Sequence, residues 1–106
     1  MSDINTWIDN EVKSNDVVLF MKGTPDMPMC GFSGRATQIL NHLGVPFKGV
    51  NVLDSDDLRQ GIKNYTNWPT IPQLYVKGEF VGGSDIMMEL FQSGELKTRM
   101  TEQGLG

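Results

Sequence analysis

The sequence contains one cysteine, Cys30, and one histidine, His42. A single thiol excludes an internal disulfide, and with it the disulfide scaffolds that hold small secreted domains together. So little cysteine is typical of a reducing compartment, and we expect a cytoplasmic protein, in a bacterial cytosol or the matrix of an organelle. Any chemistry at Cys30 must therefore involve a sulfur atom of another molecule or a metal.

The sequence also lacks an excess of positive charge and a long apolar run. Nine Lys and Arg residues stand against 13 Asp and Glu residues, which gives a net charge of −4. Because no basic stripe is present to release phosphate counterions, we expect no nucleic-acid partner. No run approaches the ~20 apolar residues that span a bilayer, and no signal segment precedes Asp3, so we expect no membrane segment. The length suits one hydrophobic core, and we predict a single domain over residues 1–106.

The pattern of apolar residues predicts a chain that mixes helices and strands. Helices are predicted at 4–12, 36–43, 58–65 and 86–91, with a weaker one at 94–100. Strands are predicted at 17–21, 47–52, 74–76 and 79–81. The first two strands enclose a helix, which implies parallel pairing, and the last two form a tight antiparallel hairpin at Lys77-Gly78. This order indicates an α/β fold, a mixed four-stranded sheet flanked by helices on both faces.

Cys30 falls at the junction between the strand at 17–21 and the helix that follows. Amide groups at the start of a helix carry partial positive charge, which stabilises the thiolate form of a nearby cysteine. The alternative is a buried thiol that acts as a small apolar side chain, the usual fate of a free cysteine. Because the flanking Pro28 and Gly31 are loop-forming residues, we favour an exposed, activated thiol.

The pair Ile71-Pro72 precedes the hairpin. A cis bond at Pro72 would turn the N–H and C=O of Ile71 toward a neighbour, where a short extended peptide can pair with them as an extra strand. The alternative is an ordinary trans proline that opens a strand, which base rates favour. A proline alone is weak evidence for a peptide-binding site, but a proline that can face a reactive cysteine is stronger evidence.

Charged residues near these positions indicate a ligand with an anionic end and a zwitterionic end. Lys22 follows the first strand, and Arg59 lies near the start of its helix, where a cation opposes the helix dipole. Ser84 and Asp85 follow a double glycine and can cap the next helix. We expect Lys22 and Arg59 to hold carboxylates, and Asp85 with the helix amides to hold the zwitterionic end. Taken singly, the two cations are equally well explained as solvated surface charges.

Two weaker candidates remain. Met27, Met29 and Cys30 form a group of soft sulfur atoms that suits Cu(I), although methionines in a small domain are mostly core or loop filler. His42 lies late in its predicted helix without a partner residue nearby, and we predict that it is a surface residue.

Four motifs, in order along the chain, closely resemble the monothiol glutaredoxins of the CGFS type. They are Lys22-Gly23-Thr24-Pro25, Cys30-Gly31-Phe32-Ser33, Trp68-Pro69-Thr70-Ile71-Pro72-Gln73 and Gly82-Gly83-x-Asp85-Ile86. The resemblance covers essentially the whole chain, and it implies a single glutaredoxin domain with a thioredoxin fold, in which a cis Pro72 lies opposite Cys30. It also implies glutathione as the ligand, held by the residues Lys22, Arg59, Ile71 (through its backbone), Ser84 and Asp85.

The resemblance further implies a role in iron–sulfur cluster assembly. Proteins of this family bind a [2Fe–2S] cluster between two protomers and pass it to acceptor apoproteins, and some pair with BolA-like partners. Such a cluster needs four thiolates. One chain offers only Cys30, so a homodimer would supply two ligands and two glutathione molecules the other two. Cys30 would then be the sole metal ligand of each protomer.

Two other functions stay open. The first is a glutathione-dependent thiol–disulfide oxidoreductase with Cys30 as the catalytic nucleophile. Ser33 stands where a dithiol enzyme has its second cysteine, and Ser84 stands where many relatives carry one, so no internal resolving disulfide can form. The second is a regulatory interaction module whose partner replaces one protomer.

Overall fold

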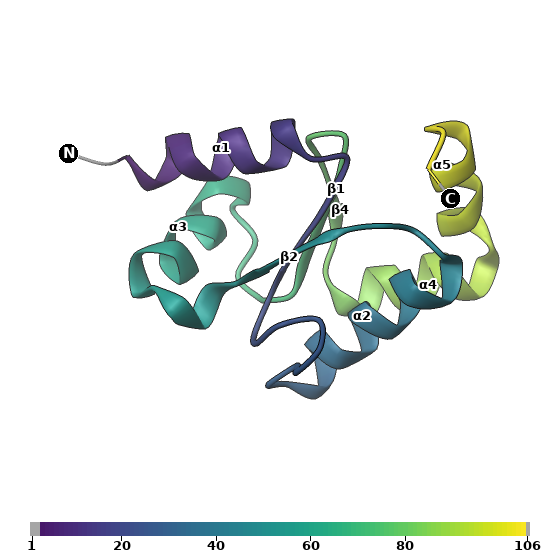
Figure 1. Cartoon of the computed structure of the whole chain (residues 1–106), viewed down its shortest axis with the longest axis horizontal. Coiled ribbons are helices and arrows are strands. Elements are labelled where there is room, and N and C mark those ends of the chain that lie inside the picture. The colour runs from purple at the N-terminus through teal and green to yellow at the C-terminus, as the bar shows by residue number, and fades with distance from the viewer. Residues whose placement is uncertain (1–2, 106) are drawn as a thin grey trace.

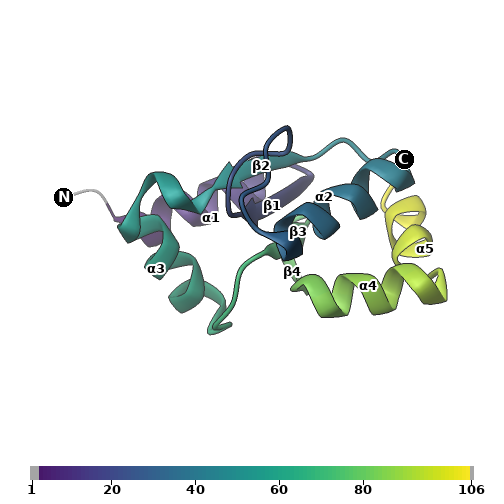
Figure 2. The same cartoon turned by 90° about the horizontal axis from the view of Figure 1, so that it is seen from below.

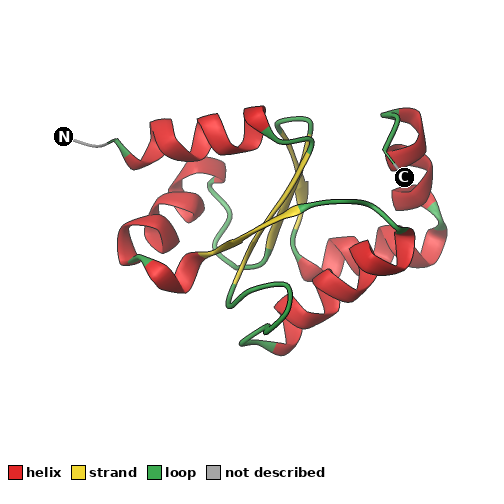
Figure 3. Cartoon of the chain, in the orientation of Figure 1, coloured by secondary structure: helices red, strands yellow, loops and turns green. Residues whose placement is uncertain are grey.

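The computed structural model describes residues 3–105 as a layered arrangement of helices around a central sheet (Figures 1 and 3). The helices are α1 Ile4–Ser14, α2 Gly31–Leu43, the 3₁₀ turn η1 Val52–Asp54, α3 Asp56–Thr66, α4 Ser84–Ser93 and α5 Glu95–Glu102. The strands are β1 Val17–Met21, β2 Lys48–Asn51, β3 Gln73–Val76 and β4 Glu79–Gly82. Within residues 3–105, no helix combines the length and the apolar character needed to cross a membrane.

The four strands lie side by side in the order β2-β1-β3-β4. Strand β1 pairs parallel with β2 and antiparallel with β3, and β3 pairs antiparallel with β4. The β3–β4 turn places Lys77 at φ 53° and Gly78 at φ 82°, the left-handed pair that a two-residue hairpin needs. The predicted mixed four-stranded sheet is confirmed, including the parallel first pair and the tight hairpin.

The side chains of β1 alternate between two hydrophobic cores, one on each face of the sheet. Val17, Leu19 and Met21 pack with apolar residues of α2, α4 and α5. Val18 and Phe20 pack with apolar residues of α1 and α3. Figures 1 and 2 show the two groups of helices on opposite sides of the strands. All five residues of β1 are buried, which explains why its sequence is a continuous apolar run.

The ends of several elements follow from single residues. Gly44 ends α2 at φ 69°, and the hydroxyl of Ser55 accepts the N–H of Leu58 at 3.2 Å at the start of α3. Strand β2 is shorter than the predicted 47–52. Its last residue, Asn51, accepts the N–H of Leu53 with its side chain and turns the chain into η1.

The predicted cap of α4 is wrong. Gly83, not Ser84, is the N-cap residue, and no side chain caps this helix. The carbonyl of Gly83 accepts the N–H of Met87 at 2.9 Å and closes the first turn. Ser84 therefore lies inside the helix, where its hydroxyl is free to face another part of the molecule.

Candidate functional site

Cys30 is the N-cap residue of α2, in an extended conformation just before the first helical turn. Its carbonyl accepts the N–H of Gly34 at 2.9 Å, and its thiol is half-buried. The buried hydroxyl of Ser33 accepts the backbone N–H of Lys22 at 3.0 Å. This bond ties the first turn of α2 to the end of β1 and fixes the sulfur near Lys22.

Polar groups at the start of α2 hold the pKa of the Cys30 thiol below its usual value. The backbone N–H of Ser33 has the largest effect, and that of Phe32, the charge of Lys22 and the Ser33 hydroxyl add to it, while partial burial of the thiol acts in the opposite direction. The first turn of α2 thus stabilises the thiolate, although no cap hydrogen bond of ordinary geometry reaches the sulfur. The direction of this pKa shift agrees with the predicted activated thiol, but the side chain is half-buried and not exposed as predicted.

The segment between Lys22 and Cys30 is a closed loop held by its own backbone. Thr24 and Met27 exchange N–H to C=O bonds of 3.2 and 3.0 Å, and the N–H of Met29 donates to the carbonyl of Lys22 at 2.9 Å. Gly23, at φ 91°, donates its N–H to the side chain of Asn51 at 2.9 Å. These hydrogen bonds fix the backbone conformation of the loop that leads to Cys30. The side chains of Met27 and Met29 are exposed.

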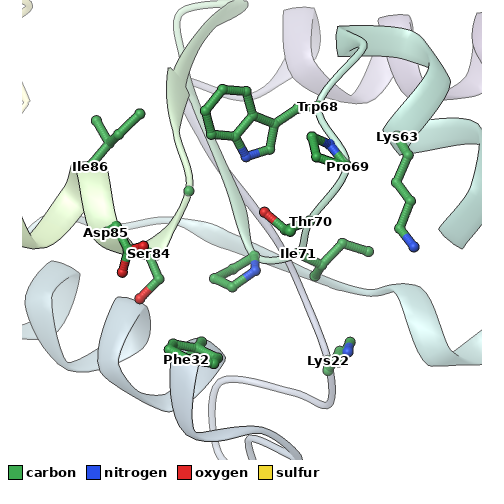
Figure 4. Close-up of a pocket in the computed structure, with 12 residues that line it drawn as sticks. Lys22, Phe32, Lys63, Trp68, Pro69, Thr70, Ile71, Ser84, Asp85 and Ile86 are labelled. Atoms are coloured by element: carbon green, nitrogen blue, oxygen red, sulfur yellow. The ribbon is translucent and has the colours of Figure 1, made fainter.

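A cavity of about 360 Å³ opens next to the start of α2 (Figure 4). Its lining residues come from four separate segments of the chain: Lys22, Phe32, Lys63, Trp68, Pro69, Thr70, Ile71, Pro72, Gly83, Ser84, Asp85 and Ile86. Five predicted site residues are therefore brought together, namely Lys22, Ile71, Pro72, Ser84 and Asp85. The Ile71–Pro72 peptide bond is cis, as the resemblance implied.

The other two predicted residues do not line this cavity. Cys30 lines an adjoining depression, while Phe32 from the same helical turn lines the cavity itself. Arg59 is not among the lining residues; its guanidinium Nη2 lies 3.5 Å from a carboxylate oxygen of Asp56 on the same helix. The cation of α3 that does line the cavity is Lys63, one turn further on.

Two polar atoms in the cavity wall are buried without a hydrogen-bond partner among residues 3–105. They are the indole Nε1 of Trp68 and the hydroxyl Oγ of Ser84. Figure 4 shows both side chains on the side of the cavity formed by β4 and α4. A buried polar group without a partner costs free energy, so the cavity wall is suited to a polar ligand. The site combines lysines, a carboxylate and these two groups beside an activated thiol.

Sequence reasoning missed Lys63 and gave Trp68 no role. Lys63 follows Arg59 by four residues, and helical spacing places the two on the same side of α3, so that signal was available. Trp68 is the first residue of the motif that ends at Gln73, but the motif alone does not show what its indole contacts. Its indole lies over the cavity because it packs against the ring of Phe80, at a centroid distance of 5.4 Å, across a long stretch of sequence.

Replacing Lys22 with glutamine is expected to raise the pKa of the Cys30 thiol, because a charge that favours thiolate is lost. The rate of Cys30 alkylation by iodoacetamide increases with pH as thiolate forms. The midpoint of this increase should lie at a higher pH in the variant than in the unchanged protein. Lys97→Gln, on the exposed surface of α5, makes the same change in net charge and should leave the profile in place. Identical profiles for all three proteins would show that Lys22 does not act on the thiol.

Comparisons with known proteins give a consistent result. The family model described as glutaredoxin matches residues 17–81. A protein of Synechocystis named as an uncharacterized monothiol glutaredoxin is 63% identical over 90 residues, which are 85% of this chain and 84% of that one. A solved structure, a monomeric truncated mutant of Trypanosoma brucei 1-C-Grx1, is 40% identical with a TM-score of 0.89 and covers 100% of this chain and 96% of its own.

A second solved structure is a complex with a small ligand. The crystal structure of a buckwheat glutaredoxin–glutathione complex has a TM-score of 0.83 at 25% identity, and covers 95% of this chain and 90% of its own. With the sheet order described above, these similarities confirm the predicted thioredoxin fold.

Proposed function

This chain belongs to the glutaredoxin family, among the monothiol glutaredoxins, and from this we propose that it carries a [2Fe–2S] cluster with glutathione as co-ligand. The observation that carries the proposal is the single activated thiol of Cys30 at the edge of a cavity with charged and unpaired polar groups. The cluster is the cargo of the protein, taken up at one place and released to an acceptor apoprotein.

The cavity has the chemistry that glutathione requires. Lys22 and Lys63 offer positive charge for the glycine carboxylate, with Arg59 one turn before Lys63 on α3. Asp85 and the start of α4 suit the ammonium and carboxylate of the γ-glutamyl end. The backbone of Ile71 can pair with the extended centre of the tripeptide. The glutathione complex of the buckwheat relative supports this choice of ligand.

The cluster needs more thiolates than one chain has. Four ligands are required, and each protomer supplies only Cys30. Two protomers and two bound glutathione molecules complete the set, so the loaded form is a homodimer. Because half of the ligands are exchangeable small molecules, the cluster can be released to an acceptor. A BolA-like partner could take the place of one protomer by supplying ligands of its own.

Anaerobic reconstitution tests this proposal. Apoprotein incubated with iron, sulfide and glutathione should develop visible absorbance and sediment as a dimer. The same mixture without glutathione should stay colourless and keep the size of the apoprotein. No coloured dimer in the complete mixture, or an equally coloured one without glutathione, would reject the cluster-carrier proposal.

The lowered pKa of Cys30 also favours a second function, that of a glutathione-dependent oxidoreductase. The Cys30 thiolate would attack the glutathione sulfur of a protein–glutathione mixed disulfide, and the protein sulfur would leave as a thiolate that takes a proton from solvent. A second glutathione thiolate would then attack the Cys30–glutathione disulfide, releasing oxidised glutathione and restoring the Cys30 thiolate. Because the chain has no resolving cysteine, every turnover depends on that second glutathione. Rapid reduction of a glutathionylated peptide would favour this function over the carrier.

A further inference from the structure

The side chain of Gln73 is fully buried at the start of β3, directly after Pro72. Burying an amide is costly unless its donors and acceptors are satisfied. The Gln73 side chain does not line the cavity. It also takes no part in the pairing of β1 with β3, which is formed by backbone groups. A buried amide at this position therefore needs another explanation.

The amide of Gln73 joins the cavity wall to the core. Its nitrogen Nε2 donates to the carbonyls of Trp68 and Thr70, both at 3.2 Å. Its oxygen Oε1 accepts the hydroxyl of Tyr75 at 3.0 Å and lies 2.9 Å from the hydroxyl of Thr66. Because a carbonyl can only accept, the nitrogen must face Trp68 and Thr70, and the orientation of the amide is fixed.

Tyr75 keeps that orientation over the whole range of working pH. Burial raises the pKa of its hydroxyl to about 12, so the group stays protonated and remains a donor. Its ring also packs edge-on against Phe20, at a centroid distance of 5.5 Å, in the core between the sheet and helices α1 and α3. The oxygen side of the Gln73 amide is thus anchored to a ring that is buried in this core.

The segment that Gln73 holds has little hydrogen bonding of its own. Residues 68–72 lie between α3 and β3, and Pro69 and Pro72 have no N–H to donate. Within residues 3–105, no backbone N–H donates to the carbonyls of Trp68 or Thr70. Gln73 is therefore their partner in the described structure, and both carbonyls belong to the stretch that leads into Ile71.

We propose that Gln73 is a positioning residue for glutathione, holding the 68–72 segment so that the backbone of Ile71 and the indole of Trp68 face the ligand. The inference rests on the proposed function, because it assigns glutathione to the cavity. Gln73 does not touch the ligand and acts through the carbonyls of Trp68 and Thr70.

Gln73→Met keeps a side chain of similar length and removes both donors. We expect its affinity for reduced glutathione, followed by chemical-shift titration, to be about tenfold or more weaker, as expected for two lost hydrogen bonds. Alkylation of Cys30 by iodoacetamide should stay within twofold of the unchanged protein, because the start of α2 is not altered. In the ligand-free protein, the backbone amides of Thr70 and Ile71 should become more mobile, seen as lower ¹⁵N order parameters.

Leu96→Ala is the matched control, because Leu96 is fully buried in the other core, on α5, and its loss destabilises the fold without touching the 68–72 segment. It should bind glutathione normally at a temperature where both variants are folded. Should Gln73→Met fail to fold, Gln73→Glu keeps the acceptor for Tyr75 and Thr66, replaces the donor with a carboxylate oxygen, and should show the same loss of affinity.

Two results would overturn the inference. One is glutathione affinity of the Gln73 variants within twofold of the unchanged protein. The other is unchanged ¹⁵N order parameters at Thr70 and Ile71 compared with Leu96→Ala. If the unchanged protein binds no glutathione, the proposed function fails, and the order parameters of the ligand-free protein alone decide whether Gln73 holds the segment.

Discussion

Cys30→Ser is expected to abolish cluster loading completely, with no visible absorbance and no dimer after anaerobic reconstitution. Cys30 is the only thiol of the chain, and iron–sulfur clusters are held by thiolates. A serine hydroxyl stays protonated near neutral pH and is a hard oxygen ligand, unsuited to soft thiolate-binding metal centres. Absorbance and sedimentation in the same sample measure the two effects together.

The variant should remain folded, which separates loss of a ligand from loss of structure. Cys30 is an N-cap residue with no cap hydrogen bond, and serine is among the preferred residues at that position. The midpoint of urea unfolding should therefore stay equal or rise, and glutathione should still shift the resonances of Lys22 and Ile71. Wild-type cluster content in Cys30→Ser would mean that the iron ligands come from elsewhere.

Gly23→Ala is expected to lower the free energy of unfolding by about 3 kcal/mol. Gly23 has φ 91°, and a Cβ added there would lie 2.5 Å from the carbonyl oxygen of Met27 and 2.6 Å from the nitrogen of Met29. Both contacts are with backbone, so no side chain can move aside to relieve them. The loop before Cys30 must then open, and we expect cluster loading to fall together with the stability measured in urea.

Gly31→Ala is the matched control for this effect. It makes the same chemical change beside Cys30, but a Cβ at Gly31 meets nothing within 4 Å, and its φ is not in the left-handed range. Alanine is also the better helix former at the start of α2. The free energy of unfolding should change by less than about 0.5 kcal/mol. Equal stability losses in the two variants would contradict the account of the loop.

Much of the fold was predictable because local signals agreed with the final structure. The apolar run of β1 is buried on both faces, Gly44 and Ser55 cap their helices, and Lys77-Gly78 forms the hairpin turn. Each of these features depends on one residue type in one backbone conformation. Such features are readable from a sequence, because they need no knowledge of distant neighbours.

The errors and omissions at the site have a different origin. Serine is a preferred N-cap residue, but Ser84 is not the N-cap of α4. After Gly82 ends β4, Gly83 has the extended backbone conformation of an N-cap residue, and Ser84 is the first residue of the helix. Lys63 and Trp68 line the cavity only because α3, β3 and α4 converge there. Arg59 carries the expected charge, but its nearest anionic partner is Asp56. These outcomes depend on tertiary packing, which no local pattern encodes.

The cavity has walls from four segments that are far apart in the sequence: Lys22 after β1, the first turn of α2, the stretch from α3 to β3, and the start of α4. No fragment of the chain holds this arrangement, so a molecule that fills the cavity binds the native chain and not the unfolded one. Occupancy therefore adds to stability through mass action, by an amount that grows with the logarithm of ligand concentration. The thiol pool around the protein would then help to determine how much of it is folded.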